Sequence, residues 1–188
     1  MTATIYTIGH STRSVAELAG LVRQVAVDLL VDVRSVPRSR TNPQFNADAL
    51  PASLAELNIA YRHLPALGGL RGRLKGGAPS ANTMWRNDSF RNYADYAQSA
   101  AFREGLDALV ALSQHDCCAI MCAEAVWWRC HRRIISDYLL TRGIPVAHIM
   151  GPGTVAPATP TPGLRRLPDG GLAYPAAASA GPLFDGSA

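Results

Sequence analysis

Apolar runs alternate with amphipathic segments along the chain, which predicts strands that alternate with helices. Short apolar runs, typical of strands covered on both faces, occur at residues 5–8, 29–33, 117–121 and 144–150, and residues 61–63 are a candidate for a further short strand. Helical periodicity lies between them, at residues 14–25, 46–57, 90–112 and 134–140. Strands that alternate with helices form parallel sheets with right-handed crossovers. We therefore predict a single α/β domain whose mainly parallel sheet of about five strands is flanked by helices in Rossmann-like or flavodoxin-like layers.

Local signals mark the ends of these helices. Ser14, with Glu17 three residues later, forms a capping-box pattern at the start of the first helix. Asn46 is a candidate N-cap for the second helix, although Pro51 fits better if that helix begins later. The long periodic segment at residues 90–112 is expected to break near Ser99. These signals support the predicted alternation of strands and helices.

The C-terminal part of the chain has a different composition. From Gly151 onward, 22 of 38 residues are Pro, Gly or Ala, and no period is visible. Such a segment buries too little apolar surface to offset the entropy lost when it is ordered. We therefore divide the chain into an α/β domain at residues 1–150 and a Pro/Gly/Ala-rich C-terminal tail at residues 151–188. Deletion after about Ala156 is expected to leave the fold intact.

Composition bounds the class of protein. With 188 residues and 48% hydrophobic residues, the chain is expected to bury one core. No window approaches the ~20 apolar residues that span a membrane, so we expect no membrane partner. The four cysteines lie between positions 117 and 130, unlike the spread framework of a secreted disulfide protein. Reduced thiols in a cytoplasmic protein are the expectation.

The basic residues are almost all arginines. The net charge is +4, and of 18 basic residues only Lys75 is a lysine. Arginine presents a planar fork that matches carboxylate and phosphate groups, although a GC-rich genome would give the same excess. The glycine-rich segment at residues 65–88 carries Arg71, Arg73 and Lys75, which predicts a long basic loop. Loops of this length in a compact domain are functional or disordered.

Residues that carry chemistry gather directly after the fourth predicted strand. Within Met121 to Arg132 stand two thiols, a carboxylate and an imidazole, from Cys122, Glu124, Cys130 and His131. Polar motifs also follow the first and second strands, as Gly9-His10-Ser11 and Asp32-Val33-Arg34. Ligands of open α/β sheets bind at the carboxyl ends of the strands. We therefore expect these three motifs to meet at one edge of the sheet.

The pattern Cys-x-Glu-x5-Cys-His-Arg resembles the bacterial family called domain of unknown function 488. Further landmarks of that resemblance are Thr7-Ile8-Gly9-His10-Ser11, Asp32-Val33-Arg34-Ser35-Val36-Pro37, Leu67-Gly68-Gly69 and the segment from Phe90 to Tyr96. The resemblance spans roughly residues 4 to 150 in the usual order of the motifs. It implies a single α/β domain with a polar site built from these motifs, and it implies no reaction.

The cysteine thiols could have two chemical roles, in addition to the possibility that they are only buried core residues. A helix N-terminus stabilises a thiolate, so Cys122 or Cys130 is a candidate nucleophile, with His10, His131 and Glu124 as candidate acid/base groups. This requires the segment around Trp127 to be a loop. Alternatively, Cys122, Cys130 and His131 could hold zinc or iron, with Glu124 or His10 as a fourth ligand. Adjacent Cys130 and His131 would point about 100° apart on a regular helix, which disfavours a shared metal.

Arginines near these motifs are candidate anion-binding groups. Asp32, Arg34, Arg38 and Arg132 are expected to bind substrate, although Asp32 and Arg34 would equally form a structural ion pair. The leading hypothesis is a thiol-dependent enzyme acting on an anionic, phosphate-bearing substrate related to nucleotides or nucleic acid. One alternative is a nucleic-acid-binding module with structural or metal-bound cysteines. Another is a redox-responsive thiol switch.

Overall fold

A six-stranded sheet forms the centre of the molecule. The computed structural model describes residues 3–73 and 79–177. The sheet has the order β3-β2-β4-β1-β5-β6, and five of its strands are parallel while β6 runs antiparallel to β5. The strands are β1 (Ile5–Gly9), β2 (Leu29–Asp32), β3 (Ala60–His63), β4 (Cys118–Cys122), β5 (Val146–Gly151) and β6 (Thr154–Pro157). The five predicted strands and their mainly parallel arrangement are confirmed.

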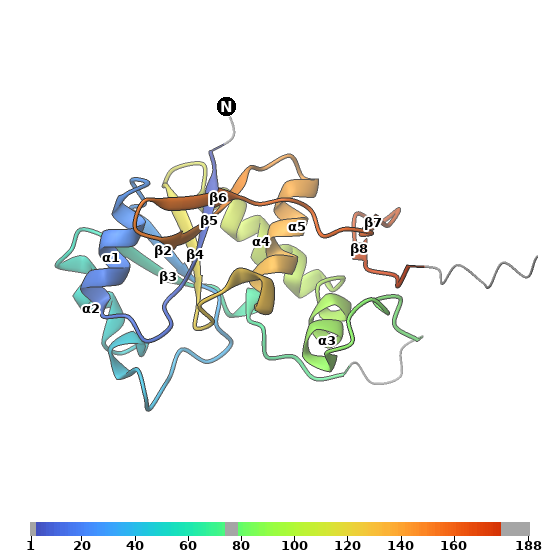
Figure 1. The fold of residues 1–188 in the computed structure, drawn as a ribbon, viewed down its shortest axis with the longest axis horizontal. Helices are drawn as coiled ribbons and strands as arrows, with labels where there is room; N and C mark the ends of the chain where they lie inside the picture. The colour runs from blue at the N-terminus through green and yellow to red at the C-terminus, as the bar shows by residue number, and fades with distance from the viewer. Residues whose placement is uncertain (1–2, 74–78, 178–188) are drawn as a thin grey trace, which may run out of the picture.

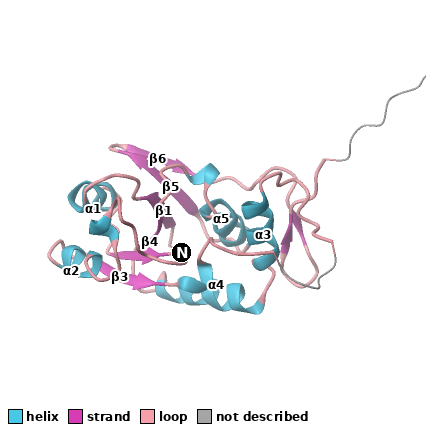
Figure 2. Cartoon of the chain, turned by 90° about the horizontal axis from the view of Figure 1, so that it is seen from below, coloured by secondary structure: helices cyan, strands magenta, loops and turns pink. Residues whose placement is uncertain are grey.

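Helices cover both faces of the sheet (Figures 1 and 2). The helices are α1 (Val15–Arg23), α2 (Leu50–Ala55), α3 (Asp88–Tyr96), α4 (Ala100–Leu112) and α5 (Arg132–Thr141). Single 3-10 turns, η1 (Pro43–Phe45), η2 (Pro65–Leu67) and η3 (Trp127–Arg129), lie in the connections. Alternate residues of each strand face opposite cores: in β2, Leu30 packs with α1 and α2, whereas Leu29 and Val31 pack with α4 and α5. The predicted three-layer α/β domain is therefore confirmed.

The helix ends follow the local signals in part. The capping box of Ser14 and Glu17 is formed, and Ser99 caps α4 after a break from α3. The second helix is shorter than predicted, because it begins only at Leu50. Asn46 does not cap it, since the Asn46 side-chain oxygen accepts a hydrogen bond from the Ser39 N–H at 2.7 Å.

The crossovers create a switch point between β1 and β4. From β1 the chain passes through α1 to β2, and from β4 it passes through α5 to β5 on the other side. The two helices lie on opposite faces of the sheet, because α1 and α5 belong to different cores. Where the connections of two neighbouring strands run in opposite directions along the sheet, a crevice opens at the carboxyl ends of those strands. Gly9 and Cys122 pair at this end of the sheet.

Residues 151–177 are part of the folded body, whereas composition assigned them to the C-terminal tail. After β6, the chain forms a small hairpin of β7 (Arg165–Arg166) and β8 (Leu172–Ala173). Leu172 and Tyr174 are fully buried in the core that contains α4 and α5. Composition misled here because a few large side chains, rather than the average residue, anchor the segment. The last predicted tail residues, 178–188, lie outside the described residues.

The predicted basic loop is irregular apart from η2 over its described residues, 65–73 and 79–87. Lys75 lies outside the described residues. Within the part of the chain that the structure describes, no helix combines the length and apolarity needed to cross a bilayer.

Candidate active site

Two thiols and one imidazole converge where β4 ends and α5 begins. The Cys122 Sγ lies 3.8 Å from the His131 Nδ1, and the Cys130 Sγ lies 3.6 Å from the same nitrogen. The other ring nitrogen, Nε2, donates to the Val33 carbonyl at 2.9 Å, since a carbonyl can only accept. The end of β2 therefore fixes the ring of His131 so that Nδ1 faces both sulfurs.

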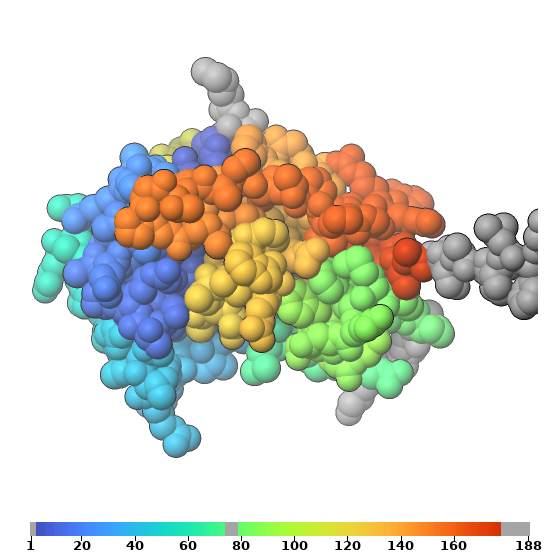
Figure 3. Space-filling model, in the orientation of Figure 1, coloured from blue at the N-terminus to red at the C-terminus, as the bar shows by residue number. Residues whose placement is uncertain are grey.

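Backbone conformation explains the convergence. Cys130 is extended, with φ −130° and ψ 149°, and only His131, with φ −58° and ψ −17°, is helical. The expected divergence of the two side chains by about 100° applies to consecutive helical residues and is wrong for this pair. The loop around Trp127 that a reactive thiol requires is present, as a connection containing the short turn η3. That connection lies on the surface between the N-terminal segment and α3 (Figure 3).

Arg132 places a positive charge against one sulfur. The Arg132 Nε donates to the Cys130 Sγ at 3.3 Å, and a terminal nitrogen donates to the Glu124 carbonyl at 2.5 Å. The arginine is only 1% exposed. Among residues 3–73 and 79–177 it forms no ion pair with a carboxylate. A buried charge needs a partner, and the Cys130 sulfur is the group placed to carry the opposite charge.

The surroundings shift the pKa values of the two cysteines in opposite directions. Burial opposes ionisation of Cys130, but the Cys122 thiol, His131 and Arg132 outweigh it and hold the pKa of Cys130 well below its usual range. The hydrogen bond to the Cys130 sulfur, followed by burial, raises the pKa of Cys122 well above its usual range. The favoured state is a Cys130 thiolate beside a neutral Cys122 thiol.

A small cavity of about 150 Å³ lies against this cluster. Its polar lining comes from Glu124, Arg129, Cys130 and His131, and its other walls come from Gly69, Ser89, Phe90 and Tyr93. Cys130 and His131 therefore line a space that a small group can enter. A larger hollow between α1 and the turn after β5 contains no thiol or imidazole, so the chemistry points to the smaller cavity.

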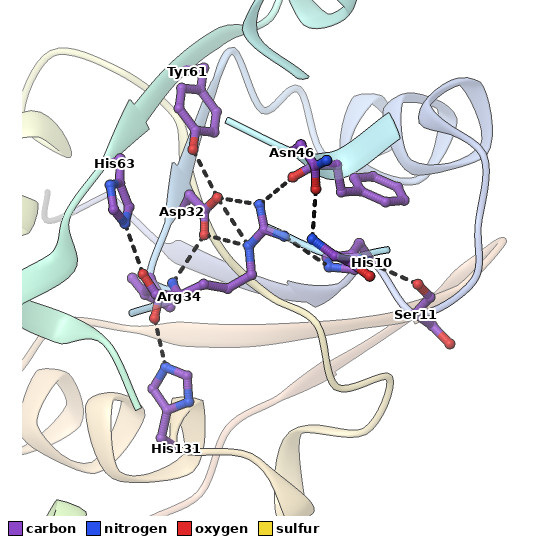
Figure 4. Close-up of polar contacts among 11 residues, drawn as sticks. His10, Ser11, Asp32, Arg34, Asn46, Tyr61, His63 and His131 are labelled. Carbon is purple, nitrogen blue, oxygen red and sulfur yellow. Dashed lines mark hydrogen bonds and ion pairs between the residues drawn. The ribbon is translucent and has the colours of Figure 1, made fainter. Parts of the chain in front are cut away.

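The motifs after β1 and β2 form a buried polar network of their own (Figure 4). Arg34 pairs with Asp32 at 2.6 Å and donates to the Phe45 carbonyl, with both side chains buried. It also contacts the His10 Nε2 at 3.3 Å. The His10 Nδ1 donates to the Ser11 carbonyl at 2.8 Å, so Nε2 accepts from Arg34 and the ring is neutral.

This network supports the alternative of a structural ion pair. Burial, followed by the charge of Arg34, lowers the pKa of His10, which is 2% exposed and stacks on Phe45. Asp32 also accepts from the Tyr61 hydroxyl at 2.8 Å. His10, Asp32 and Arg34 thus lie at the expected edge, but they hold one another and do not line the cavity. Arg38 is exposed in the following loop and also lies outside the cavity lining.

Glycines allow the elements around the site to approach one another. A Cβ on Gly9 would lie 1.9 Å from the Glu124 carbonyl oxygen, and one on Gly69 would lie 2.3 Å from the His131 Nδ1. Gly69 and Tyr93 received no site role in the sequence analysis, although the Leu67-Gly68-Gly69 motif contained the signal. Tyr93 is both buried in the core and part of the cavity wall.

Comparison with known families gives one finding. The family model described as Domain of unknown function DUF488 matches residues 14–139. The matched region includes Cys122, Glu124, Cys130 and His131, whereas His10 precedes it. Searches of the curated proteins and of the solved structures give no match.

Proposed function

Because the chain belongs to the family described as Domain of unknown function DUF488, whose description specifies no reaction, we propose a function from the geometry of the thiol cluster. The protein is a thiol-dependent enzyme that uses the Cys130 thiolate as its nucleophile on an anionic, phosphate-bearing substrate. His131 is the acid/base group, and Cys122 is the hydrogen-bond donor that stabilises the thiolate.

The observation that carries this proposal is the contact between Arg132 and Cys130. A guanidinium that is 1% exposed and has a sulfur within 3.3 Å favours the anionic form of that sulfur. The arrangement of nucleophile, base and orienting group is also present, as Cys130, His131 and the Val33 carbonyl. A cysteine buried only for packing needs none of these groups.

The cavity suggests the substrate class. A water molecule occupies about 30 Å³ of liquid, so 150 Å³ accommodates one phosphate or carboxylate group rather than a whole nucleotide. Arg129 on the cavity wall and the N-terminus of α5 both favour negative charge there. The remainder of a nucleotide or nucleic-acid substrate would extend outside.

The proposed reaction begins with attack of the Cys130 sulfur on an electrophilic atom next to the bound anion. The bond to the leaving group breaks as the carbon–sulfur or phosphorus–sulfur bond forms, and the proton that Cys130 gave up to His131 passes from Nδ1 to the leaving group. Water or another acceptor then displaces the sulfur and returns a proton to His131. This sequence restores the thiolate.

The pH dependence of iodoacetamide labelling, resolved by mass spectrometry in metal-free protein, tests the nucleophile. Cys130 should label with a midpoint below the value of about 8.5 for a free thiol. Arg132→Met and Cys122→Ala should raise that midpoint, because each removes a group that stabilises the thiolate. Cys122→Ser keeps a hydroxyl donor and should raise it less. Cys117→Ser, outside the cluster, is the matched control.

Slow labelling of Cys130 at every pH below 8.5 in folded protein would overturn the proposal. The competing function is then a nucleic-acid-binding module, favoured by the 46% exposed Trp128 beside exposed Arg129. That module predicts oligonucleotide affinity that falls steeply with salt. A thiol switch is the better description if mild oxidation joins Cys122 to Cys130 in protein whose reduced thiols alkylate slowly.

A further inference from the structure

The three donor atoms of the cluster have the arrangement of a metal site. We propose that Cys122, Cys130 and His131 bind one zinc ion, with the fourth coordination position open toward the cavity. Their donor atoms all lie within 4.8 Å of one another. The inference goes beyond the proposed function and does not depend on it, since metal binding is measured without any substrate.

The distances between donors fit a tetrahedral ion. Zinc–sulfur bonds of about 2.3 Å and zinc–nitrogen bonds of about 2.0–2.1 Å, at a tetrahedral angle, place sulfur and nitrogen about 3.5–3.6 Å apart. The observed separations from the His131 Nδ1 are 3.6 Å to the Cys130 sulfur and 3.8 Å to the Cys122 sulfur. Both sulfur–nitrogen separations are therefore within a few tenths of an ångström of the tetrahedral value, and the two sulfurs lie within 4.8 Å of each other.

The imidazole is held as a metal ligand requires. Metal-binding histidines donate their other ring N–H to a carboxylate, a carbonyl or water, which fixes the tautomer and the orientation of the ring. The His131 Nε2 makes this contact with the Val33 carbonyl at 2.9 Å. Tyr93 packs edge-on against the ring, with centroids 5.0 Å apart, and Gly69 leaves room for it. The donor is thus oriented before any ion arrives.

The donor types select the ion, and the cavity defines its fourth position. Two thiolates with one imidazole suit zinc, whereas magnesium and calcium prefer oxygen ligands. His10 is not the fourth ligand, because both its ring nitrogens are engaged with Ser11 and Arg34. Cys130 and His131 line the cavity, so water or a substrate atom supplies the fourth ligand from there. Zinc and an electrophile then compete for the same Cys130 sulfur.

Metal content and cobalt substitution test this inference. Protein purified without chelator, and protein stripped and then dialysed against zinc, should each hold one equivalent. Cobalt(II) should give the intense visible bands of a tetrahedral ion and a thiolate charge-transfer band in the near ultraviolet. Cys122→Ser, Cys130→Ser and His131→Asn should each weaken zinc binding more than about 100-fold, since loss of an outer partner alone weakens it about 10- to 100-fold.

Matched controls keep a folding defect separate from a lost ligand. Cys117→Ser and His115→Asn, which change the same residue types outside the cluster, should bind zinc like the wild type. In the unmodified protein, zinc should suppress alkylation of Cys130, and chelator should restore it. The inference is wrong if wild-type protein holds no stoichiometric zinc, or if the cobalt spectrum lacks the thiolate band.

The two proposals can fail separately. Fast labelling of metal-free Cys130 together with no zinc binding would remove the metal site and keep the nucleophile. One bound equivalent of zinc together with thiols that stay slow to alkylate after chelation would keep the metal site and remove the nucleophile.

Discussion

At the scale of single residues, His148 illustrates how burial turns an imidazole into a pH-sensitive part of the fold. His148 lies in β5 and is 2% exposed; its Nδ1 lies 2.8 Å from the Thr7 hydroxyl, and its ring stacks on Trp127. Burial, followed by the charge of Arg132, lowers the pKa of His148 to about 4. The folded state therefore holds the ring neutral, beside the connection that carries Cys130.

The linkage predicts acid lability. Because the folded pKa is depressed below 6.5, the stabilisation is complete above that pH and is lost as the pH falls toward about 4. The shift corresponds to at most about 3 kcal/mol. Urea unfolding between pH 7 and pH 4.5 should show this loss in the free energy of unfolding. His148→Gln should make the free energy of unfolding less dependent on pH. The pKa of His10 is also lowered, so His10 accounts for the pH-dependent loss of stability that remains in His148→Gln. Exposed His115→Gln is the control. If the free energy of unfolding of His148→Gln changes with pH as steeply as that of the wild type, this account is wrong.

At the scale of elements, the close approach between the end of β1 and the segment after β4 positions the site. A Cβ on Gly9 would overlap the backbone of Glu124 and Ala125, neither of which can move as a flexible side chain would. Gly9→Ala should therefore lower the free energy of unfolding by about 1–3 kcal/mol. It should also slow labelling of Cys130, because the shifted segment leads to that thiol.

Gly20 in α1 provides the matched control. A Cβ there meets no atom within 4 Å, and the glycine is exposed in a helix. Gly20→Ala should raise the free energy of unfolding by about 0.5–1 kcal/mol, through the lower entropy of the unfolded chain. Chemical denaturation of both variants checks the pair. Equal stability of Gly9→Ala and the wild type would mean that β1 and the connection separate easily.

At the scale of the whole molecule, the C-terminal segment closes the core on the α5 side of the sheet. Tyr174 is fully buried, its hydroxyl donates to Asp137 at 3.0 Å, and its carbonyl accepts from the Met84 N–H at 2.9 Å. Tyr174→Ala should destabilise the protein by about 3–5 kcal/mol, as do other truncations of buried aromatic residues. Deletion after Ala156 should lower the melting temperature at least as much.

Exposed Arg166 is the control for that segment. Arg166→Ala should leave the melting temperature within a degree or two, because surface substitutions change stability by only about 0.5 kcal/mol. A truncated protein that melts like the wild type would show that residues 157–177 contribute little to the core, despite their burial.

Local sequence patterns were sufficient to predict the alternation of strands and helices, the break at Ser99 and the position of the cysteine motif at the carboxyl edge. These properties depend on neighbours within a few turns of chain, because apolar period and capping chemistry are local. The position of polar motifs directly after the strands β1, β2 and β4 also predicted that these motifs meet, since parallel strands end at the same edge of the sheet.

The contacts between groups at that edge depend on how distant parts of the chain pack together. Arg34 contacts His10 across 24 positions, the Val33 carbonyl orients His131 across 98, and Tyr174 packs against elements far earlier in the chain. The strand order and the extended backbone of Cys130 likewise follow from packing. Local patterns specify which face of an element is apolar, but they do not specify which other element packs against that face. The division between a buried ion-pair network and a thiol cluster that lines a cavity is therefore a property of the assembled fold.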